Sequence, residues 1–458
     1  MPIATINPAT GETEREFEAH DAAEVERRVA LADVAFDALK RTTFAQRAEW
    51  MNRAADILDS ENEQVAEMMT REMGKPIVAA RAEAAKCAKG FRYYAKHAEE
   101  FLADEPLADP SSVNASRAYA RYQPLGAILA VMPWNFPFWQ VVRFAAPALM
   151  AGNTGVLKHA SNVPQAAMYL DALFTRAGFP EGAFTAVLIG SREVDAIIKD
   201  PRIKAVTLTG SEPAGRAVAS SAAAEVKKAV LELGGSDPFI VMPSADLDGA
   251  VATAVTARTQ NNGQSCIAAK RFIVHADVYE AFCEKFTDAM KSLKIGDPLR
   301  DDTQIGPIAT ASGRDDLVEL VEDARSHGAE ILAGGAVPDG VGWFYPPTVI
   351  AGVTPEMRIH LEEAFGPVAT LYKVANAAEA IELANSTSFG LSSAAWTTDA
   401  DEQELFSNEL QAGGVFINGM TISYPELAFG GIKNSGYGRE LGSSGIKEFC
   451  NMKTIWKA

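Results

Sequence analysis

The chain has 458 residues, a formal net charge of −18 and a hydrophobic content of 48%. This length allows about three domains with a large buried core, and the composition excludes a disordered chain. The acidic balance argues against a nucleic-acid-binding surface, and it means that an anionic ligand must be attracted by local cations.

The sequence carries no sign of a targeting segment, a membrane span or a metal site. Residues 1–16 lack the basic and apolar regions of a signal peptide, and the most apolar stretch, 126–139, is interrupted by Pro133, Asn135 and Pro137. The cysteines form no C-x-x-C pair, and no two histidines have the spacing of metal ligands. We therefore expect a cytoplasmic protein that binds no metal, nucleic acid or membrane.

The first third of the chain is predicted to be mostly helical. Asp21 and Glu24 have the spacing of a capping box, and apolar residues recur at helical spacing from Val25 to Leu39. A second amphipathic region covers residues 44–102. In residues 111–122 polar and apolar residues alternate instead, which predicts an exposed antiparallel hairpin.

From Gly126 onward, short apolar segments alternate with helical ones. Because the short segments are continuously apolar, they are typical of strands buried on both faces and predict a doubly wound parallel sheet. A second α/β unit starts after Gly234–Gly235, with a domain boundary expected near residue 232. The predicted strands are Ala127–Met132, Gly155–Lys158, Ala183–Ile189, Ala205–Thr209, Ala229–Leu233 and Pro238–Met242.

The stretch Gly210–Gly215 is a candidate phosphate-binding turn. No G-x-G-x-x-G follows a predicted strand, and Arg216 and Ala217 stand where a P-loop needs lysine and serine or threonine. The stretch nevertheless lies between a predicted strand and a predicted helix, where backbone N–H groups and the Ser211 hydroxyl can hold a pyrophosphate. An ordinary turn between strand and helix is the alternative interpretation.

Three further residues are candidates for catalysis. Cys266 follows the polar stretch 261–265, unlike the other cysteines, and an exposed thiol at the end of an element can be a nucleophile. Glu232 ends a predicted strand, at the edge where open α/β sheets bind ligands. Asn135 lies between two prolines, and a rigid amide there can bind an oxyanion. The structural alternatives are a buried thiol, a solvent-facing acid and a cap or turn residue, respectively.

Taken together, these motifs resemble those of the aldehyde dehydrogenase family, over essentially the whole chain. The fold implied by this resemblance is α/β, with two doubly wound parallel-sheet domains and a small bridging β-hairpin. It implies a dinucleotide-binding domain (1–104 and 126–231), a catalytic domain (232–442) and an element that pairs subunits in a homodimer or homotetramer (105–125 and 443–458). In chain order the motifs are Asn7–Gly11, Pro133–Pro137, Leu231–Gly235, Gly263–Cys266, Glu362–Pro367 and Phe429–Gly436.

The resemblance also implies a role for each motif. Cys266 adds to the aldehyde carbonyl, the Asn135 side chain and the Cys266 N–H bind the oxyanion, and Glu232 activates the water that hydrolyses the thioester. The cofactor contacts that it implies are Lys158 at the adenosine ribose, Gly210 and Ser211 at the pyrophosphate, Glu363 at the nicotinamide ribose, and Phe365, Trp134 and Leu233 around the nicotinamide.

The segment Lys158–Ser161 predicts the choice of cofactor. It departs from the family's common Lys-Pro-x-Glu, whose glutamate hydrogen-bonds the 2′-hydroxyl and repels a 2′-phosphate at a cost of several kcal/mol for charges about 4 Å apart. Ser161 removes that repulsion, and Lys158 and His159 add attraction. NADP is therefore expected to be preferred, with NAD bound more weakly. A surface histidine is the alternative for His159.

Within the family, the chain resembles the succinate-semialdehyde dehydrogenases. Arg143 and Ser423 match an arginine and a serine that bind the distal carboxylate in those enzymes. Many of them carry a second arginine where this chain has Gln260, which leaves Arg143, Ser265 and Ser423 to hold the carboxylate. A surface arginine is the alternative for Arg143.

The expected function is the NADP-dependent oxidation of succinate semialdehyde to succinate. A broader aldehyde dehydrogenase, acting on glutarate semialdehyde or neutral aliphatic aldehydes, is the nearest alternative. A non-catalytic structural relative is a third, and the intact set of Cys266, Glu232 and Asn135 argues against it.

Overall fold

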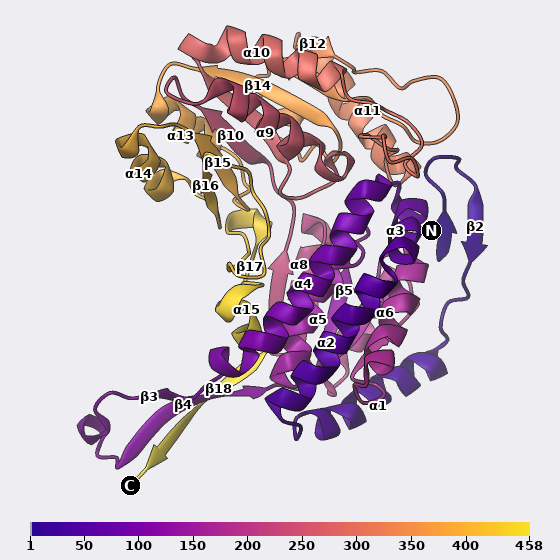
Figure 1. Cartoon of the computed structure of the whole chain (residues 1–458), viewed down its shortest axis with the longest axis vertical. Helices are drawn as coiled ribbons and strands as arrows, with labels where there is room; N and C mark the ends of the chain where they lie inside the picture. Colours follow the sequence, from indigo (N-terminus) through magenta and orange to yellow (C-terminus); the bar gives the residue numbers. More distant parts are fainter. Residues whose placement is uncertain (1) are drawn as a thin grey trace.

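The computed structural model describes residues 2–458 and contains two mostly parallel sheets (Figure 1). In spatial order, the first sheet consists of β17 (Gly436–Tyr437), β9 (Lys228–Glu232), β8 (Ile203–Thr209), β5 (Ala127–Met132), β6 (Thr154–His159) and β7 (Phe184–Ala186). The second consists of β12 (Glu330–Ala333), β13 (Thr348–Ala351), β14 (Val368–Val374), β11 (Ala269–His275), β10 (Asp237–Val241), β15 (Ser393–Trp396) and β16 (Val415–Ile417). In each sheet one edge strand, β17 or β12, is antiparallel to its neighbour, and the other pairs are parallel. The α/β architecture with two parallel-sheet units is thus confirmed.

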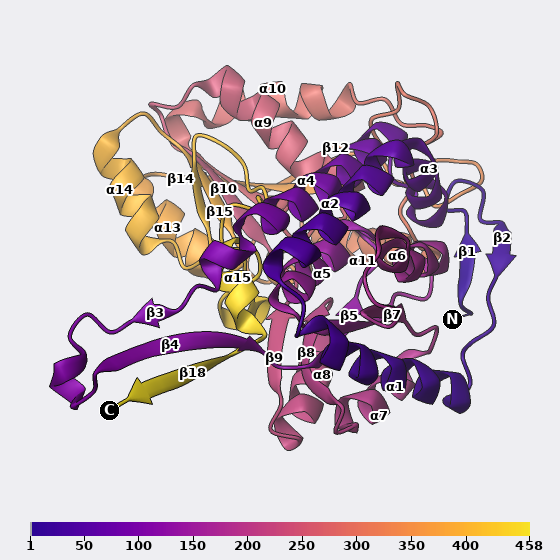
Figure 2. The same cartoon turned by 60° about the horizontal axis from the view of Figure 1, so that its bottom comes forward.

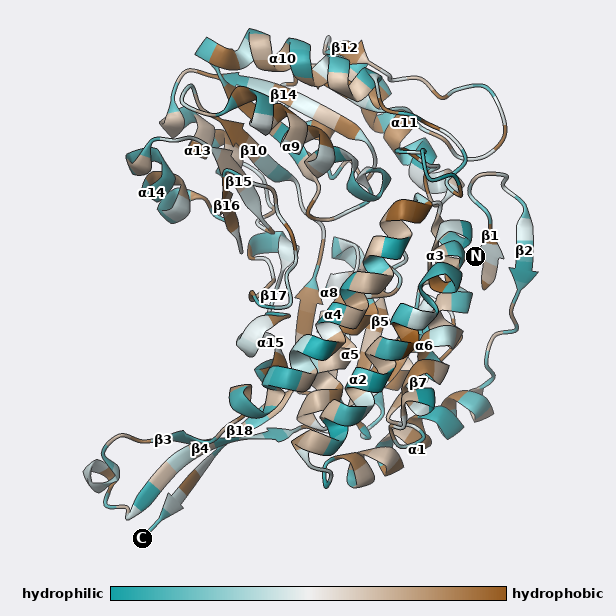
Figure 3. Ribbon diagram, viewed as in Figure 1, coloured by the Kyte–Doolittle hydropathy of each residue, from teal (hydrophilic) through white to brown (hydrophobic). Residues whose placement is uncertain are grey.

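Both faces of the first sheet are covered by helices, which is why its strands are apolar throughout. Ala127 and Leu129 of β5 point to one face and pack with residues of α1 and α8. Ile128 and Ala130 point to the other face and join the core formed by α2 to α6. Figure 3 shows the matching pattern, with apolar strands inside and polar bands on the outer sides of α2 and α4. The helices of this unit are α1 (Ala22–Leu39), α2 (Phe44–Ser60), α3 (Asn62–Met73), α4 (Ile77–Phe101), α5 (Trp139–Ala151), α6 (Pro164–Ala177), α7 (Val194–Lys199) and α8 (Glu212–Ala224).

The N-terminal helices begin and end where the local sequence requires it. Asp21 caps α1 by accepting a hydrogen bond from Glu24 N at 2.8 Å, although the Glu24 carboxylate binds arginines instead of completing a capping box. The predicted amphipathic region 44–102 is divided into three helices. One division is at Gly74, whose φ of +76° is left-handed, followed closely by Pro76. None of the helices among residues 2–458 has the length and apolar character needed to cross a bilayer.

The strand order of the first sheet reverses beside β5. The chain passes from β5 to β6 and β7 on one side and then returns to place β8 and β9 on the other. Parallel sheets of this kind leave a crevice at the carboxyl ends of the strands on either side of the reversal. Pro133–Pro137 follows β5 and Gly210–Ser211 follows β8, so two of the predicted motifs meet at this crevice.

The second sheet is likewise covered on both faces. One face packs against α9 and α10, and the other against α11, α13 and α14. Its helices are α9 (Leu247–Thr259), α10 (Ala276–Lys291), α11 (Ala311–Ser326), α12 (Arg358–Leu361), α13 (Ala377–Asn385) and α14 (Ala400–Glu409), and α15 (Gly442–Glu448) follows β17.

A thin arm projects from the body of the molecule (Figures 1 and 2). It consists of β3 (Glu105–Pro106), β4 (Arg117–Pro124) and β18 (Cys450–Lys457), with β4 paired antiparallel to β18 along its whole length. The predicted antiparallel hairpin is present in part, because β3 pairs antiparallel with β4 at Ala120 and Tyr119. The prediction missed the longer partner of β4, which is β18 at the other end of the chain. Two short strands, β1 (Ala4–Ile6) and β2 (Thr13–Glu16), form a separate ribbon near the N-terminus.

Candidate active site

The candidate catalytic residues lie where the two sheets face each other. Asn135 follows β5 at the carboxyl edge of the first sheet, and Cys266 precedes β11 at the amino edge of the second. Both line a cavity of about 270 Å³. Most of the predicted cofactor residues line the same cavity, namely Trp134, Gly210, Ser211, Leu233, Glu363 and Phe365.

A buried asparagine ties the Asn135 loop to the Cys266 loop. Asn261 Nδ2 donates to Asn135 O at 2.7 Å and to Gln264 O at 2.9 Å, and Asn135 Nδ2 donates to the same Gln264 oxygen at 3.2 Å. Asn261 and Asn262 both have left-handed backbones, with φ of 54° and 57°, a conformation that asparagine tolerates better than most residues. The distance between the amide and the thiol is thus set by hydrogen bonds rather than left to a mobile loop.

Lys270 fixes the other side of the catalytic loop. Its Nζ donates to Ser265 O at 2.8 Å and to Cys266 O at 2.6 Å, and it forms an ion pair of 2.9 Å with Glu363. The glycines before β10 are required by this close packing. A Cβ on Gly235 would lie 2.9 Å from Cys266 O, and one on Gly234 would lie 2.5 Å from Glu363 Oε2.

Burial acts strongly on the ionisation of the Cys266 thiol. The surrounding protein removes most of its solvent and raises the pKa of Cys266 to about 12, although Arg143 and Lys270 act in the opposite direction. Arg143 and Lys270 therefore favour the thiolate, but desolvation is the larger effect on the pKa of Cys266.

Glu232 is buried rather than facing solvent, with an exposed fraction of 1%. Burial, followed by repulsion from Glu440, raises the pKa of Glu232 well above its usual range, while Arg143 opposes the shift. Neither of its carboxyl oxygens has a hydrogen-bond partner within residues 2–458. A Cβ on Gly430 would lie 2.7 Å from Glu232 Oε1, so this glycine leaves the carboxyl room. Once ionised, such a carboxylate is a strong base.

Arg143 is buried on α5 and is therefore not a surface arginine. Its Nε forms an ion pair with Glu440, its Nη2 donates to Thr209 Oγ1 at 3.3 Å, and its guanidinium lies 4.7 Å from the centre of the Phe429 ring. It borders a second cavity of about 50 Å³. The lining of this cavity includes all three predicted substrate residues, Arg143, Ser265 and Ser423, together with Cys266 and Gln260.

Lys158 is the penultimate residue of β6, at the carboxyl edge of the first sheet, and it is not among the residues that line the two cavities. It has an exposed fraction of 8%, and burial lowers its pKa while Glu193 raises it. No carboxylate among residues 2–458 lies within ion-pair distance of its Nζ, so the lysine has donors free for an anion.

His159 does not have the predicted orientation. The imidazole is buried with an exposed fraction of 5%, Nε2 lies 2.8 Å from Pro137 O, and Nδ1 accepts a hydrogen bond from Ala160 N at 2.9 Å. Burial lowers the pKa of His159 to about 4. Both the surface alternative and the prediction of an added positive charge for the cofactor are corrected, because the ring is neutral and supports the Asn135 loop.

The loop of Ser161 is held by the N-terminal strand. Ala4 N donates to Ser161 O at 3.1 Å. The buried Glu72 accepts hydrogen bonds from Thr5 Oγ1 at 2.8 Å and from Gln165 N at 2.8 Å, which joins β1, α3 and the start of α6. Burial raises the pKa of Glu72 to about 8.

Several residues of the site were missed by sequence reasoning. Lys86 of α4 donates to Ser423 Oγ at 2.9 Å and also lines the smaller cavity. Glu440, Lys270 and Asn261 hold Arg143, Glu363 and the catalytic loop, respectively. Asn261 and Glu440 lie next to motifs that were recognised. Lys86 occupies an alanine-rich helix with two other lysines, Lys89 and Lys96, and nothing in the sequence distinguishes it from them.

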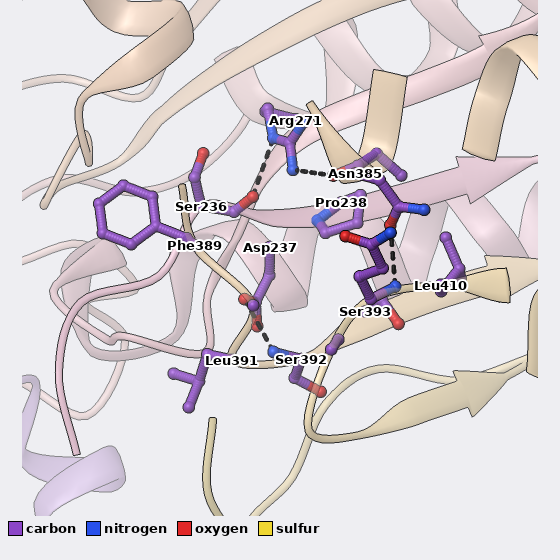
Figure 4. A pocket seen from close by; sticks show the side chains of 14 residues that line it. Ser236, Asp237, Pro238, Arg271, Asn385, Phe389, Leu391, Ser392, Ser393 and Leu410 are labelled. Atoms are coloured by element: carbon purple, nitrogen blue, oxygen red, sulfur yellow. Dashed lines mark hydrogen bonds between the residues drawn. The ribbon is translucent and has the colours of Figure 1, made fainter. Parts of the chain in front are cut away.

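A further cavity beside the Gly234–Gly235 loop is structural (Figure 4). Arg271 donates to Ser236 O at 2.8 Å and to two carbonyls of α13, and Asp237 Oδ1 accepts from Ser392 N at 3.1 Å. Burial raises the pKa of Asp237 to about 7. The space is about 10 Å³, roughly that of one water molecule, so the cluster anchors the loop rather than binding a ligand.

Comparison with known proteins agrees with this geometry over the full chain. The sequence model of the "Aldehyde dehydrogenase family" matches residues 1–455. The chain is 63% identical to the succinate-semialdehyde dehydrogenase [NADP(+)] of Mycolicibacterium paratuberculosis, with 100% of this chain and 97% of that protein covered. It is 62% identical to succinate-semialdehyde dehydrogenase [NADP(+)] 1 of Mycobacterium tuberculosis, with 100% of both covered.

Solved structures show the same likeness in three dimensions. The crystal structure of succinic semialdehyde dehydrogenase from Streptococcus pyogenes with NADP+ has a TM-score of 0.96 at 37% identity, and 99% of each chain is covered. The sequence match, the two-sheet fold and the cavity that brings Cys266 and Asn135 together agree, and the chain belongs to the aldehyde dehydrogenase family.

Proposed function

We propose that this protein oxidises succinate semialdehyde to succinate with NADP as the electron acceptor. One observation carries the proposal: Cys266 borders two cavities at once, one with the predicted nicotinamide residues and one with Arg143, Ser265 and Ser423. Relatives more than 60% identical over the whole chain that are named succinate-semialdehyde dehydrogenase [NADP(+)] support the same activity.

The residues present fit a dinucleotide with a 2′-phosphate. Gly210 and Ser211 precede α8, so that backbone N–H groups at the start of this helix can receive a pyrophosphate. Trp134 and Phe365, with ring centres 5.7 Å apart, form an aromatic side of the larger cavity. Lys158 would bind the 2′-phosphate region beside Ser161, which adds no negative charge. When bound, NADP supplies a hydride acceptor.

The chain's own groups account for the remaining chemistry. The Cys266 thiol releases its proton to solvent, and the thiolate sulfur bonds to the aldehyde carbon. The C=O π bond breaks in the same step, so that the carbonyl oxygen becomes an oxyanion. Asn135 Nδ2 and Cys266 N–H donate to that oxygen. After the hydride has left, a water attacks the thioester carbon, Glu232 takes the water's proton, and the acid departs as the Cys266 sulfur leaves.

We also propose that Arg143, Ser265 and Ser423 form the wall that receives the distal carboxylate. Ser265 Oγ is buried and has no hydrogen-bond partner within residues 2–458, so it can donate to a substrate oxygen. The arm of residues 105–125 and 443–458 is proposed as the element that joins subunits in a homodimer or homotetramer, with 1–104 and 126–231 as the dinucleotide-binding domain and 232–442 as the catalytic domain.

A panel of aldehydes tests this function. Succinate semialdehyde and butanal have the same chain length, as do glutarate semialdehyde and pentanal, and each is assayed with NADP and with NAD. We expect the highest kcat/KM for succinate semialdehyde with NADP. Equal values for all four aldehydes would favour a broad aldehyde dehydrogenase, and no turnover of any of them would contradict catalysis.

A further inference from the structure

Two of the described residues that line the smaller cavity beside Cys266 are cations, Arg143 and Lys86, and a carboxylate within residues 2–458 balances the charge of only one of them. Arg143 is paired with Glu440. Lys75 does not line this cavity, and it is paired with Glu83, whose other oxygen accepts the N–H groups of Phe138 and Trp139 at 3.0 and 2.9 Å. Lys86, in contrast, has no carboxylate within ion-pair distance anywhere in residues 2–458. The excess positive charge of this cavity therefore comes from Lys86.

Protein contacts fix Lys86 in place without neutralising it. Its Nζ donates to Ser423 Oγ at 2.9 Å and lies 4.3 Å from the centre of the Trp139 ring. Burial lowers the pKa of Lys86 to about 8, and Arg143 adds to the effect. Keeping an ammonium group partly desolvated without a counter-ion costs stability, and a bound anion would offset that cost.

Ser423 is arranged to donate rather than to accept. Its oxygen already accepts hydrogen bonds from Lys86 Nζ at 2.9 Å and from Trp139 Nε1 at 2.8 Å. A hydroxyl has two acceptor positions and one proton, and no acceptor for that proton is found among residues 2–458. The proton of Ser423 and the remaining protons of Lys86 can therefore both be offered to a carboxylate.

We propose that Lys86 is a specificity-determining residue that binds the distal carboxylate of the aldehyde substrate together with the Ser423 hydroxyl. The inference rests on the proposed function and deepens it. It places the attracting charge on α4, whereas Arg143 has its charge balanced by Glu440, and Gln260 in the same lining is neutral.

The test replaces Lys86 by methionine, which keeps the length of the side chain and removes its charge. We expect Lys86→Met to lower the ratio of kcat/KM for succinate semialdehyde to that for butanal by about 10- to 100-fold, mostly through KM, as for loss of a charged hydrogen bond. Lys86→Arg should restore most of the ratio. Lys89→Met is the matched control, since Lys89 is an exposed lysine of the same helix with an exposed side-chain fraction of 58% and pairs with Glu426.

Each outcome decides between the two levels of the proposal. If the wild-type enzyme prefers succinate semialdehyde to butanal and Lys86→Met keeps the same preference, the role of Lys86 is overturned and the proposed substrate stands. An equal loss on both aldehydes, with a lower unfolding temperature, assigns Lys86 to structure and also overturns it. A wild-type enzyme that oxidises both aldehydes equally overturns the proposed substrate and this role with it.

Discussion

The ion pair between Arg143 and Glu440 gives a prediction that separates two roles of this arginine. Both side chains are almost completely buried, and the Glu232 carboxyl is close enough for Glu440 and Arg143 to shift its pKa in opposite directions. Replacing Arg143 by methionine leaves Glu440 buried without its counter-ion. We therefore expect losses in stability and in turnover of every aldehyde, with only a smaller loss that is specific to succinate semialdehyde.

The size of the stability loss follows from the burial. Removing one partner of a buried ion pair costs about 3–5 kcal/mol. With an unfolding entropy of about 2.1 cal/mol/K per residue, the whole chain has roughly 1 kcal/mol/K, so the unfolding midpoint should fall by about 3–5 °C. Arg53→Met is the matched control, because Arg53 forms a surface pair with Glu49, and such pairs contribute about 0–1 kcal/mol.

The loss should also depend on pH in a defined direction. Burial raises the pKa of Glu440 above its usual value, and Arg143 opposes that shift. Without Arg143 the folded-state pKa rises further, so the folded state keeps a proton that the unfolded state releases, and stability falls as pH increases above about 4. Arg143→Met should consequently be more destabilised relative to wild type at pH 8 than at pH 5.

Calorimetry at the two pH values and steady-state assays with succinate semialdehyde and butanal measure these effects. Adding Glu440→Gln to Arg143→Met should recover part of the stability, because it removes the orphaned charge. If Arg143→Met impaired only succinate semialdehyde and left butanal turnover and the unfolding midpoint unchanged, the reasoning from the ion pair would be refuted.

Three other predictions concern the thiol, the oxyanion and the cofactor. Asn135→Ala should lower kcat by about 10²–10³-fold with NADP affinity retained, and a loss confined to KM would contradict an oxyanion role. Alkylation of Cys266 by iodoacetamide, measured without cofactor, should be slow at pH 7.5, and its rate should rise about tenfold per pH unit up to pH 10. Cys266→Ser serves as the blank. A rate that levels off below pH 9 would show that the thiol is more acidic than its burial indicates. Ser161→Glu should lower the ratio of kcat/KM with NADP to kcat/KM with NAD by at least about tenfold, because the new carboxylate repels the 2′-phosphate. Ser161→Ala should change this ratio little. An unchanged ratio in Ser161→Glu would show that the 2′-phosphate does not bind beside residue 161.

The strands of the first sheet were predictable because a strand buried on both faces has a continuous run of apolar residues. The predicted Ala127–Met132 matches β5 at both ends, and Ala229–Leu233 differs from β9 by one residue at each end. The pairing of two strands that are distant in sequence has no comparable pattern in the sequence. The alternating segment before residue 124 shows that a strand exists, but its partner β18 lies more than 300 residues later.

The site was predictable where a motif carries its function in a few adjacent residues, as in Pro133–Pro137 and Gly263–Cys266. Ionisation states were not, because they depend on burial by residues from elsewhere in the chain. Cys266 is desolvated by the residues around it, and the buried His159 ring lies within hydrogen-bond distance of the Pro137 carbonyl. Lys86 could not be found either, since only the tertiary fold brings α4 to the loop of Ser423.

The attachment of the Ser161 loop to β1 has a practical consequence for changing the coenzyme. Ala4 and Thr5 steady this loop from outside, through a backbone hydrogen bond and through Glu72. A library built to convert the enzyme to the unphosphorylated coenzyme should therefore include Thr5 and Glu72 as well as Ser161. For the same reason, an affinity tag fused ahead of β1 is a poor choice when coenzyme selectivity is the trait being engineered.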